Sequence, residues 1–302
     1  MSIWTSLDAQ VVTEGLHPAA VGALRDRWGH PAFGASRRLI VVRRGTVPAR
    51  PEPGQDAPAG PGGTAVRVRG DELWIGASLY LRVGESGTEV TVQGDGHTVP
   101  EAAWTLALAE AHRAAGWLSL HAAVLTTQGE QGAALGGPSG AGKSTAALRW
   151  TAAGGGLAAE DQTWVWPGTG QAIGLDRWLR SSEEGVRRFA PGLLARAEGF
   201  DAHGKLRLPL ISPGAGVTLS TLLVFGVPTQ PTAPERVRAL WEASGVPLSA
   251  LGRRQAAAGV TALLARLSIR GVTRETVLEA AHQTLHPSTS AETGTLPGSA
   301  DG

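Results

Sequence analysis

The stretch 132-GAALGGPSGAGKSTAALRW-150 constrains the fold of this chain more than any other part of its sequence. Residues Gly137 to Ser144 match the pattern G-x-x-x-x-G-K-[ST] at every fixed position, after an apolar run and before an alanine-rich one. In that pattern a strand leads into a tight glycine turn, and the turn leads into a helix whose N-terminus binds phosphate. The sequence therefore predicts an α/β fold around a P-loop, or Walker A loop, that binds a nucleotide.

Each residue of this loop has an expected role. The Lys143 ammonium can reach the β- and γ-phosphate oxygens, and the Ser144 hydroxyl can ligate Mg²⁺. ATP and Mg²⁺ are therefore the expected cofactors. The expected nucleotide-binding residues are Gly137, Pro138, Ser139, Gly140, Ala141, Gly142, Lys143, Ser144 and Thr145, the last of which helps to start the helix. The alternative is a glycine-rich turn that arose by chance in a chain with 42 glycines.

Composition narrows the class of protein. The chain has 302 residues, of which 42% are hydrophobic, so it can bury one sizeable core or two modest ones. A net charge of +1 argues against charge-driven binding of nucleic acid. There is no cysteine, no apolar run long enough to span a membrane, and no signal-peptide pattern after Met1. We therefore expect a cytoplasmic protein with no nucleic-acid or membrane partner; homo-oligomerisation is left open.

Hydrophobic periodicity predicts a small N-terminal α+β region over residues 1–99, with a Pro/Gly-rich loop at 47–65. Within it we expect a helix at 17–29, a strand at 38–45, and an antiparallel meander built from 66–70, 73–83 and 89–94.

A kinase-like α/β domain is predicted over residues 100–285, followed by a disordered tail at 286–302. Its expected helices are 101–116, 144–153, 249–269 and 273–285. Its expected strands are 117–127, 133–137, 217–227 and an apolar strand that starts at 157 and ends at Glu160 and Asp161.

Two kinds of side chain near the loop could carry chemistry. Glu160 and Asp161 follow an apolar strand soon after the loop helix, where a metal-phosphate site would need carboxylates; two solvated carboxylates are the alternative.

The arginines could be a solvated face or a clamp for phosphate and acceptor, and for any single one we favour the solvated face; they are Arg177, Arg180, Arg187, Arg188, Arg253 and Arg254. Six tryptophans are expected mainly in the core: Trp104, Trp117, Trp150, Trp164, Trp166 and Trp178.

Other nucleotide-binding classes lack their own signatures in this sequence. No N-K-x-D segment is present to read guanine, which argues against a GTPase. The segment 251-LGRRQ-255 is a poor match to the signature of an ABC transporter motor. A transporter motor is therefore not expected.

Three segments in order resemble the core of the HPr kinase/phosphorylase superfamily: 120-LHAAVL-125, 135-LGGPSGAGKST-145 and 154-GGGLAAEDQTWVW-166. The spacing agrees, because 22 positions separate His121 from Lys143 and 17 separate Lys143 from Glu160. The resemblance covers roughly residues 100–225. The N-terminal region also resembles the front end of HPr-kinase-related proteins, some of which modify peptides in lasso-peptide clusters.

The resemblance implies an ATP-dependent kinase and assigns roles to particular residues. Asp161 would help to hold Mg²⁺, Glu160 would accept the proton of the acceptor hydroxyl, and His121 would line the site beside Lys143. Glu160 stands where the family usually has aspartate, which changes its reach by one methylene. The family's downstream arginine- and glycine-rich signature has no convincing match in 180–192 or 204–209, so HPr itself is not the expected acceptor.

The expected activity is transfer of the γ-phosphate to a serine or threonine hydroxyl of a peptide or protein. Without the resemblance, His121 would be interpreted as a histidine packed in a sheet. Two other functions are left open by the residues. One is a nucleotide-binding regulatory or accessory protein without efficient transfer, and the other is a small-molecule kinase.

Overall fold

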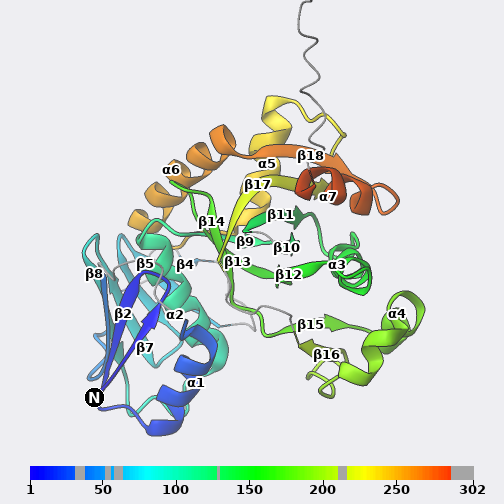
Figure 1. Cartoon of the computed structure of the whole chain (residues 1–302). Coiled ribbons are helices and arrows are strands. Elements are labelled where there is room, and N and C mark those ends of the chain that lie inside the picture. The colour runs from blue at the N-terminus through cyan, green and yellow to red at the C-terminus, as the bar shows by residue number, and fades with distance from the viewer. Residues whose placement is uncertain (31–37, 52–55, 58–63, 128–129, 210–215, 287–302) are drawn as a thin grey trace, which may run out of the picture.

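A computed structural model describes residues 1–30, 38–51, 56–57, 64–127, 130–209 and 216–286 of this chain. The molecule is a mixed α/β structure with two large sheets and a separate two-stranded hairpin (Figure 1). All of the expected tail at 286–302 except His286, and much of the expected loop at 47–65, lie outside the described residues. No described helix is long and apolar enough to cross a membrane.

The N-terminal sheet has eight strands among the described residues, and it is larger than the sequence predicts. In spatial order the strands are β1 (Ser2–Ser6), β2 (Ala9–Glu14), β3 (Arg38–Arg44), β8 (Gly87–Val92), β7 (Leu79–Val83), β6 (Glu72–Ile75), β5 (Val66–Arg69) and β4 (Asp56–Ala57). The predicted antiparallel meander is confirmed as β5 to β8, and the predicted first helix as α1 (Pro18–Trp28). The hairpin of β1 and β2, which we did not predict, extends the sheet on the far side of β3.

The second sheet contains the strand that leads into the glycine-rich loop. Its spatial order is β12 (Gly156–Ala159), β10 (Ala123–Thr126), β11 (Gln131–Gly136), β17 (Val217–Phe225), β14 (Gln171–Gly174), β13 (Gln162–Trp166) and β9 (Leu118–His121), with β18 (Ser268–Val272) also paired to β17. Both β11 and β18 run parallel to β17, so their carboxyl ends lie at the same edge of the sheet. The loop 137–144 begins at that edge.

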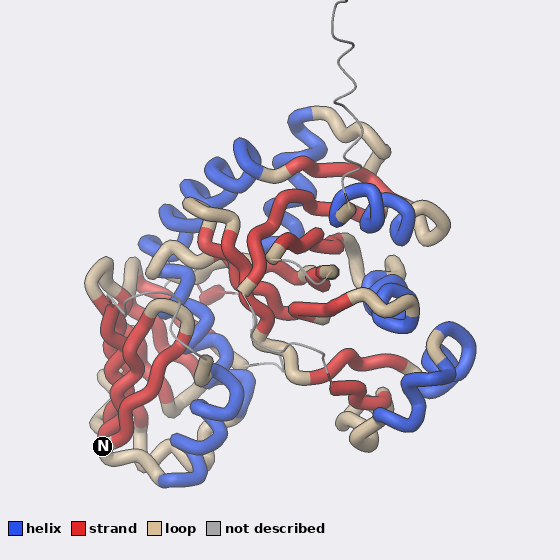
Figure 2. Tube along the Cα trace, in the orientation of Figure 1, coloured by secondary structure: helices blue, strands red, loops and turns tan. Residues whose placement is uncertain are grey.

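Helices cover both faces of this sheet (Figures 1 and 2). Along β11, Ala133 and Leu135 pack with α3 (Lys143–Ala152) and α7 (Val277–Leu285), whereas Ala134 packs on the opposite side with α5 (Ala233–Ser244) and α6 (Ala250–Arg266). This alternation is the period of two that a strand buried on both faces requires. The result is a three-layer arrangement that fixes the start of α3 beside the sheet edge.

Two expected elements are divided in the structure. The segment 117–127 is not one strand, because the chain breaks at Ala122: β9 pairs with β13, while β10 pairs with β11 and β12. The expected helix 249–269 ends at Arg266, and residues 268–272 form β18. Periodicity is a weak guide to both boundaries. A continuous apolar run does not show where one strand ends and the next begins, and a short apolar segment at the end of a helix fits a buried strand equally well.

A small arm projects from the second sheet after β14 (Figure 1). It consists of β15 (Trp178–Ser181), α4 (Glu183–Phe189), a short 3₁₀ helix (Pro191–Arg196) and β16 (Leu206–Pro209). Leu179 and Leu208 of the hairpin pack in the same core as α3, so the arm is attached beside the helix that follows the glycine-rich loop.

Helix α2 (Glu101–Ala114) joins the two sheets, and His112 of this helix is fully buried at the junction. Its Nε2 lies 2.8 Å from the Ser6 hydroxyl, and its ring contacts the rings of Trp28 and Trp164. Four of the six tryptophans expected in the core are buried, namely Trp104, Trp117, Trp150 and Trp164, whereas Trp166 and Trp178 are partly exposed.

The burial of His112 predicts an acid-sensitive fold. Burial is the largest cause that lowers the pKa of His112 to about 3, and the nearby charges of Arg38 and His30 act in the same direction. Above pH 6.5 the imidazole is neutral in both states. Below it the unfolded chain binds a proton that the folded chain does not, so the free energy of unfolding falls by about 1.4 kcal/mol per pH unit towards pH 3. Urea denaturation at pH 7 and pH 5 should show this fall. A fall of the same size in His112→Gln would contradict the assignment.

Candidate functional site

The glycine-rich loop joins β11 to α3 as the sequence predicts. All three of its glycines have positive φ: 137° at Gly137, 77° at Gly140 and 120° at Gly142. At Gly137 space also excludes a side chain, because an added Cβ would lie 2.8 Å from the Cβ of Phe225 on the neighbouring strand. Helix α3 begins at Lys143, so its unpaired N-terminal amides are adjacent to the loop.

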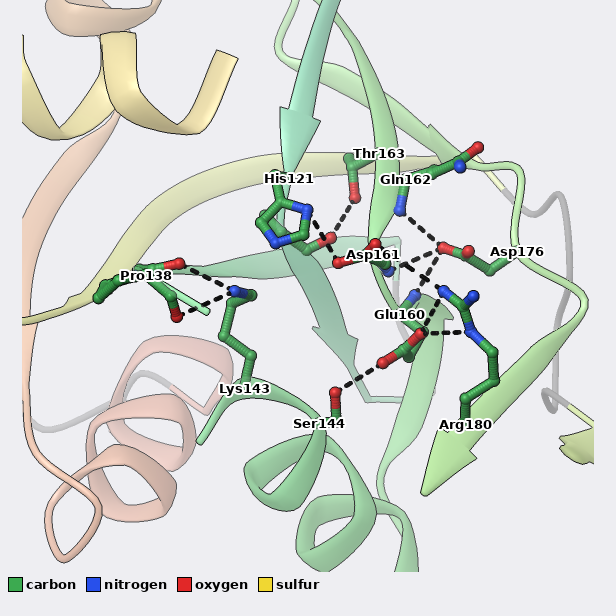
Figure 3. A network of polar contacts seen from close by, with 12 residues as sticks. His121, Pro138, Lys143, Ser144, Glu160, Asp161, Gln162, Thr163, Asp176 and Arg180 are labelled. Carbon is green, nitrogen blue, oxygen red and sulfur yellow. Dashed lines mark hydrogen bonds and ion pairs between the residues drawn. The ribbon is translucent and has the colours of Figure 1, made fainter. Parts of the chain in front are cut away.

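Lys143 turns back over its own loop. Its Nζ donates hydrogen bonds to the carbonyls of Gly137 at 2.8 Å and Pro138 at 3.4 Å (Figure 3). Burial lowers the pKa of this ammonium, while the charges of Asp161 and Glu160 raise it. The net effect lowers the pKa of Lys143 below its usual value, and the two carboxylates are close enough to act on its charge while its Nζ is directed to the carbonyls of its own loop (Figure 3).

Ser144 and Glu160 are in direct contact. The Ser144 hydroxyl donates to Glu160 Oε1 at 2.7 Å. Glu160 follows β12, and only 5% of its side chain is exposed. The sequence interpretation assigned Ser144 and Asp161 to one metal ion, whereas the structure places Glu160 against Ser144 (Figure 3).

Asp161 is in contact with His121. The two are adjacent because His121 is opposite Gln162 in the antiparallel pairing of β9 and β13. His121 Nδ1 lies 2.9 Å from Asp161 Oδ1, and the Asp161 side chain is 30% exposed. Burial would raise the pKa of Asp161, but His121, Arg180 and Lys143 together lower it below its usual value. His121 itself is 52% exposed, so it is not the packed sheet histidine of the alternative interpretation.

Asp176, which the sequence analysis did not single out, holds the backbone of the acidic pair. One oxygen, Oδ2, accepts the N–H groups of Glu160 at 3.0 Å, Asp161 at 2.8 Å and Gln162 at 2.8 Å. The close approach of β14 to β12 allows this, because a Cβ on Gly174 would lie 2.0 Å from the Ala158 carbonyl oxygen. The signal in the sequence was an aspartate just after a glycine-ended strand, which is too common to single out.

Removing Asp176 should therefore destabilise the turn. Asp176→Ala leaves three turn amides without their acceptor, and we expect the free energy of unfolding to fall by about 2 kcal/mol. Asp176→Asn keeps one carbonyl oxygen at the same place, so its free energy of unfolding should fall clearly less than that of Asp176→Ala. Urea denaturation of both variants measures the difference, and equal losses would show that the side chain fills space without ordering these amides.

Arg180 completes the site from the arm. Its Nε and Nη2 donate to Glu160 Oε2 at 3.3 and 3.1 Å, and Nη2 lies 3.8 Å from Asp161 Oδ2. The sequence interpretation treated Arg180 like the other five arginines, as part of a solvated face. Only the pairing of β15 with β16 beside α3 brings this guanidinium to the carboxylates, and sequence spacing carries no signal for that.

The donor set suits a hard divalent cation. Within the described residues, no three His, Asp or Glu side chains converge as a metal cluster. Mg²⁺ at a nucleotide site does not require one, because it takes one or two protein oxygens and completes its shell with water and phosphate. The Ser144 hydroxyl and the Glu160 carboxylate provide such oxygens, and Asp161 lies beside them. Burial raises the pKa of Glu160, and a bound cation would relieve this desolvation.

A separate cavity of about 340 Å³ lies at the other end of α3. Trp150, His282 and His286 line it together with the turn after the helix. None of the residues assigned to the site from the sequence contributes to it.

No protein-family model matches the chain, and no curated protein matches it in sequence. The function is therefore argued from the geometry of this site.

Proposed function

We propose that this chain is an ATP-dependent kinase of the HPr-kinase-like type, with a P-loop at residues 137–144. The proposed reaction transfers the γ-phosphate of ATP to a serine or threonine hydroxyl of a peptide or protein. The observation that carries the proposal is the 2.7 Å contact of Ser144 with Glu160. It joins the hydroxyl that ends the G-x-x-x-x-G-K-[ST] pattern to a buried carboxylate, which is the pairing that a magnesium-nucleotide site uses.

The exposed fractions of the Glu160 and Asp161 side chains support exchanging the roles that the resemblance implied for them. Glu160 lies beneath Ser144 and Arg180 with 5% of its side chain exposed, so an acceptor hydroxyl cannot reach it directly. Asp161 is 30% exposed and rests against the exposed His121. We therefore assign Glu160 with Ser144 to holding Mg²⁺, and Asp161 to accepting the hydroxyl proton while His121 orients it.

The remaining groups supply charge. Mg²⁺, when bound, would neutralise the phosphate oxygens and favour a loose transition state. Arg180 contacts both carboxylates and Lys143 lies over the glycine-rich loop (Figure 3), and both side chains can donate to phosphate oxygens that enter the site. Catalysis of this kind needs positioning and charge more than a strong base, which agrees with the low pKa of Asp161.

The test is transfer of labelled phosphate from Mg-ATP. Purified protein is offered a cell extract, HPr, short peptides containing serine or threonine, and common sugars and nucleosides, and the acid-stable label is identified by mass spectrometry. We expect label on a peptide or protein hydroxyl. Label on a sugar or nucleoside alone would indicate a small-molecule kinase. Tight ATP binding with no labelled acceptor would indicate the regulatory function instead.

A further inference from the structure

One arginine contacts the glycine-rich loop from outside the acidic site. Arg274 lies in the turn between β18 and α7. Its Nη2 donates to the Gly140 carbonyl at 2.8 Å and its Nε to the Ala141 carbonyl at 3.1 Å. Its side-chain stem lies against Gly142, where an added Cβ would be 3.4 to 3.8 Å from Arg274 atoms. A single side chain therefore contacts two consecutive loop carbonyls and lies close to the glycine that follows them.

The topology explains this contact. Because β18 and β11 both run parallel to β17, the turn after β18 and the loop after β11 leave the sheet at the same edge. The backbone of Arg274 is itself held by α3, since Arg149 Nη1 donates to the Arg274 carbonyl at 3.3 Å. The turn is closed by the Thr273 N–H, which donates to Thr276 Oγ1 at 3.0 Å. The guanidinium thus projects from a braced turn.

Fixing a carbonyl also fixes the amide of the same peptide. In a planar trans peptide the N–H points opposite to the C=O. With the Ala141 carbonyl turned towards Arg274, the Gly142 N–H is directed to the other side of the loop, at the start of α3. The neighbouring Ala141 N–H is already used, because it donates to the Pro138 carbonyl at 3.2 Å. The Gly142 amide is the one whose direction Arg274 sets.

We propose that Arg274 is a positioning residue for the glycine-rich loop, one that holds two of the loop's peptide planes so that the Gly142 amide faces a polyphosphate. This inference rests on the nucleotide site of the proposed function. It makes the 273–276 turn a part of phosphate recognition, although the turn lies more than 120 residues away in sequence from the loop motif.

The test compares three ligands, Mg-ATP, Mg-ADP and magnesium pyrophosphate, by calorimetric titration of the full chain. Arg274→Ala should bind all three about five- to tenfold more weakly, which corresponds to the net contribution of roughly one typical hydrogen bond. Arg274→Lys keeps the charge but cannot span both carbonyls, so its affinity for the three ligands should fall by nearly as much. The matched control is Arg238→Ala, which removes an exposed arginine that pairs with Glu242 on α5.

The outcomes separate the inference from the proposed function. Unchanged affinity in Arg274→Ala, or full recovery in Arg274→Lys, would overturn the inference alone. So would a loss for ATP and ADP that spares pyrophosphate, because Arg274 would then contact the nucleoside. If ligand-free Arg274→Ala melts at a clearly lower temperature than ligand-free Arg238→Ala, Arg274 has a general structural role, and this result would also overturn the inference. If the wild-type chain binds none of the ligands, the proposed nucleotide site fails and the inference with it.

Discussion

Lys143→Ala should weaken Mg-ATP binding by about 10- to 100-fold, because each charge-assisted hydrogen bond to a phosphate contributes about 1.5 to 3 kcal/mol. Phosphate transfer should fall further still, since the proposed reaction develops negative charge on the phosphate oxygens that this ammonium would contact. Calorimetric titration and the labelled-phosphate assay measure the two effects.

The unfolding free energy of the ligand-free variant provides the internal control. Among the described residues the Lys143 ammonium is hydrogen-bonded only to carbonyls of its own loop, so we expect its loss to change stability by no more than about 1 kcal/mol. Wild-type ATP affinity in a folded Lys143→Ala protein would exclude the P-loop interpretation.

Substitutions of Glu160 and Asp161 should have different effects, one on Mg²⁺-dependent ATP binding and the other on phosphate transfer. Glu160→Gln weakens a ligand that we assign to Mg²⁺, so it should raise the Mg²⁺ concentration needed for half-maximal ATP binding by about tenfold. Asp161→Asn should leave that concentration nearly unchanged and lower the transfer rate by about 10²- to 10⁴-fold, the range expected for loss of a general base.

This pattern is the reverse of the one that the family resemblance implies, so the pair of variants decides between the two assignments. The control is Glu242→Gln, which makes the same change of charge on an exposed residue of α5. A transfer defect in Glu160→Gln at saturating Mg²⁺, with normal transfer in Asp161→Asn, would restore the original assignment. Equally small effects of both changes would favour two carboxylates with no part in the reaction.

Local sequence was sufficient for the segments whose structure depends on their own residues. The strand, glycine turn and helix around residues 132–152 could be predicted because each has a short-range cause: an apolar run, glycines that accept positive φ, and a run of good helix formers. The meander of β5 to β8 has the same origin, in alternating residues separated by turn residues. The presence of Glu160 and Asp161 beside the loop also followed from sequence order.

Tertiary structure decided which groups meet. Which carboxylate of the pair faces Ser144 depends on the turn between β12 and β13, and that turn is held by Asp176, which follows β14. Arg180 and Arg274 reach the site from the arm and from the turn after β18, through pairings over long separations that periodicity does not encode. The sequence determined the local elements and the motif, because propensity and periodicity are local. The directions of the side chains were determined by the packing of distant strands.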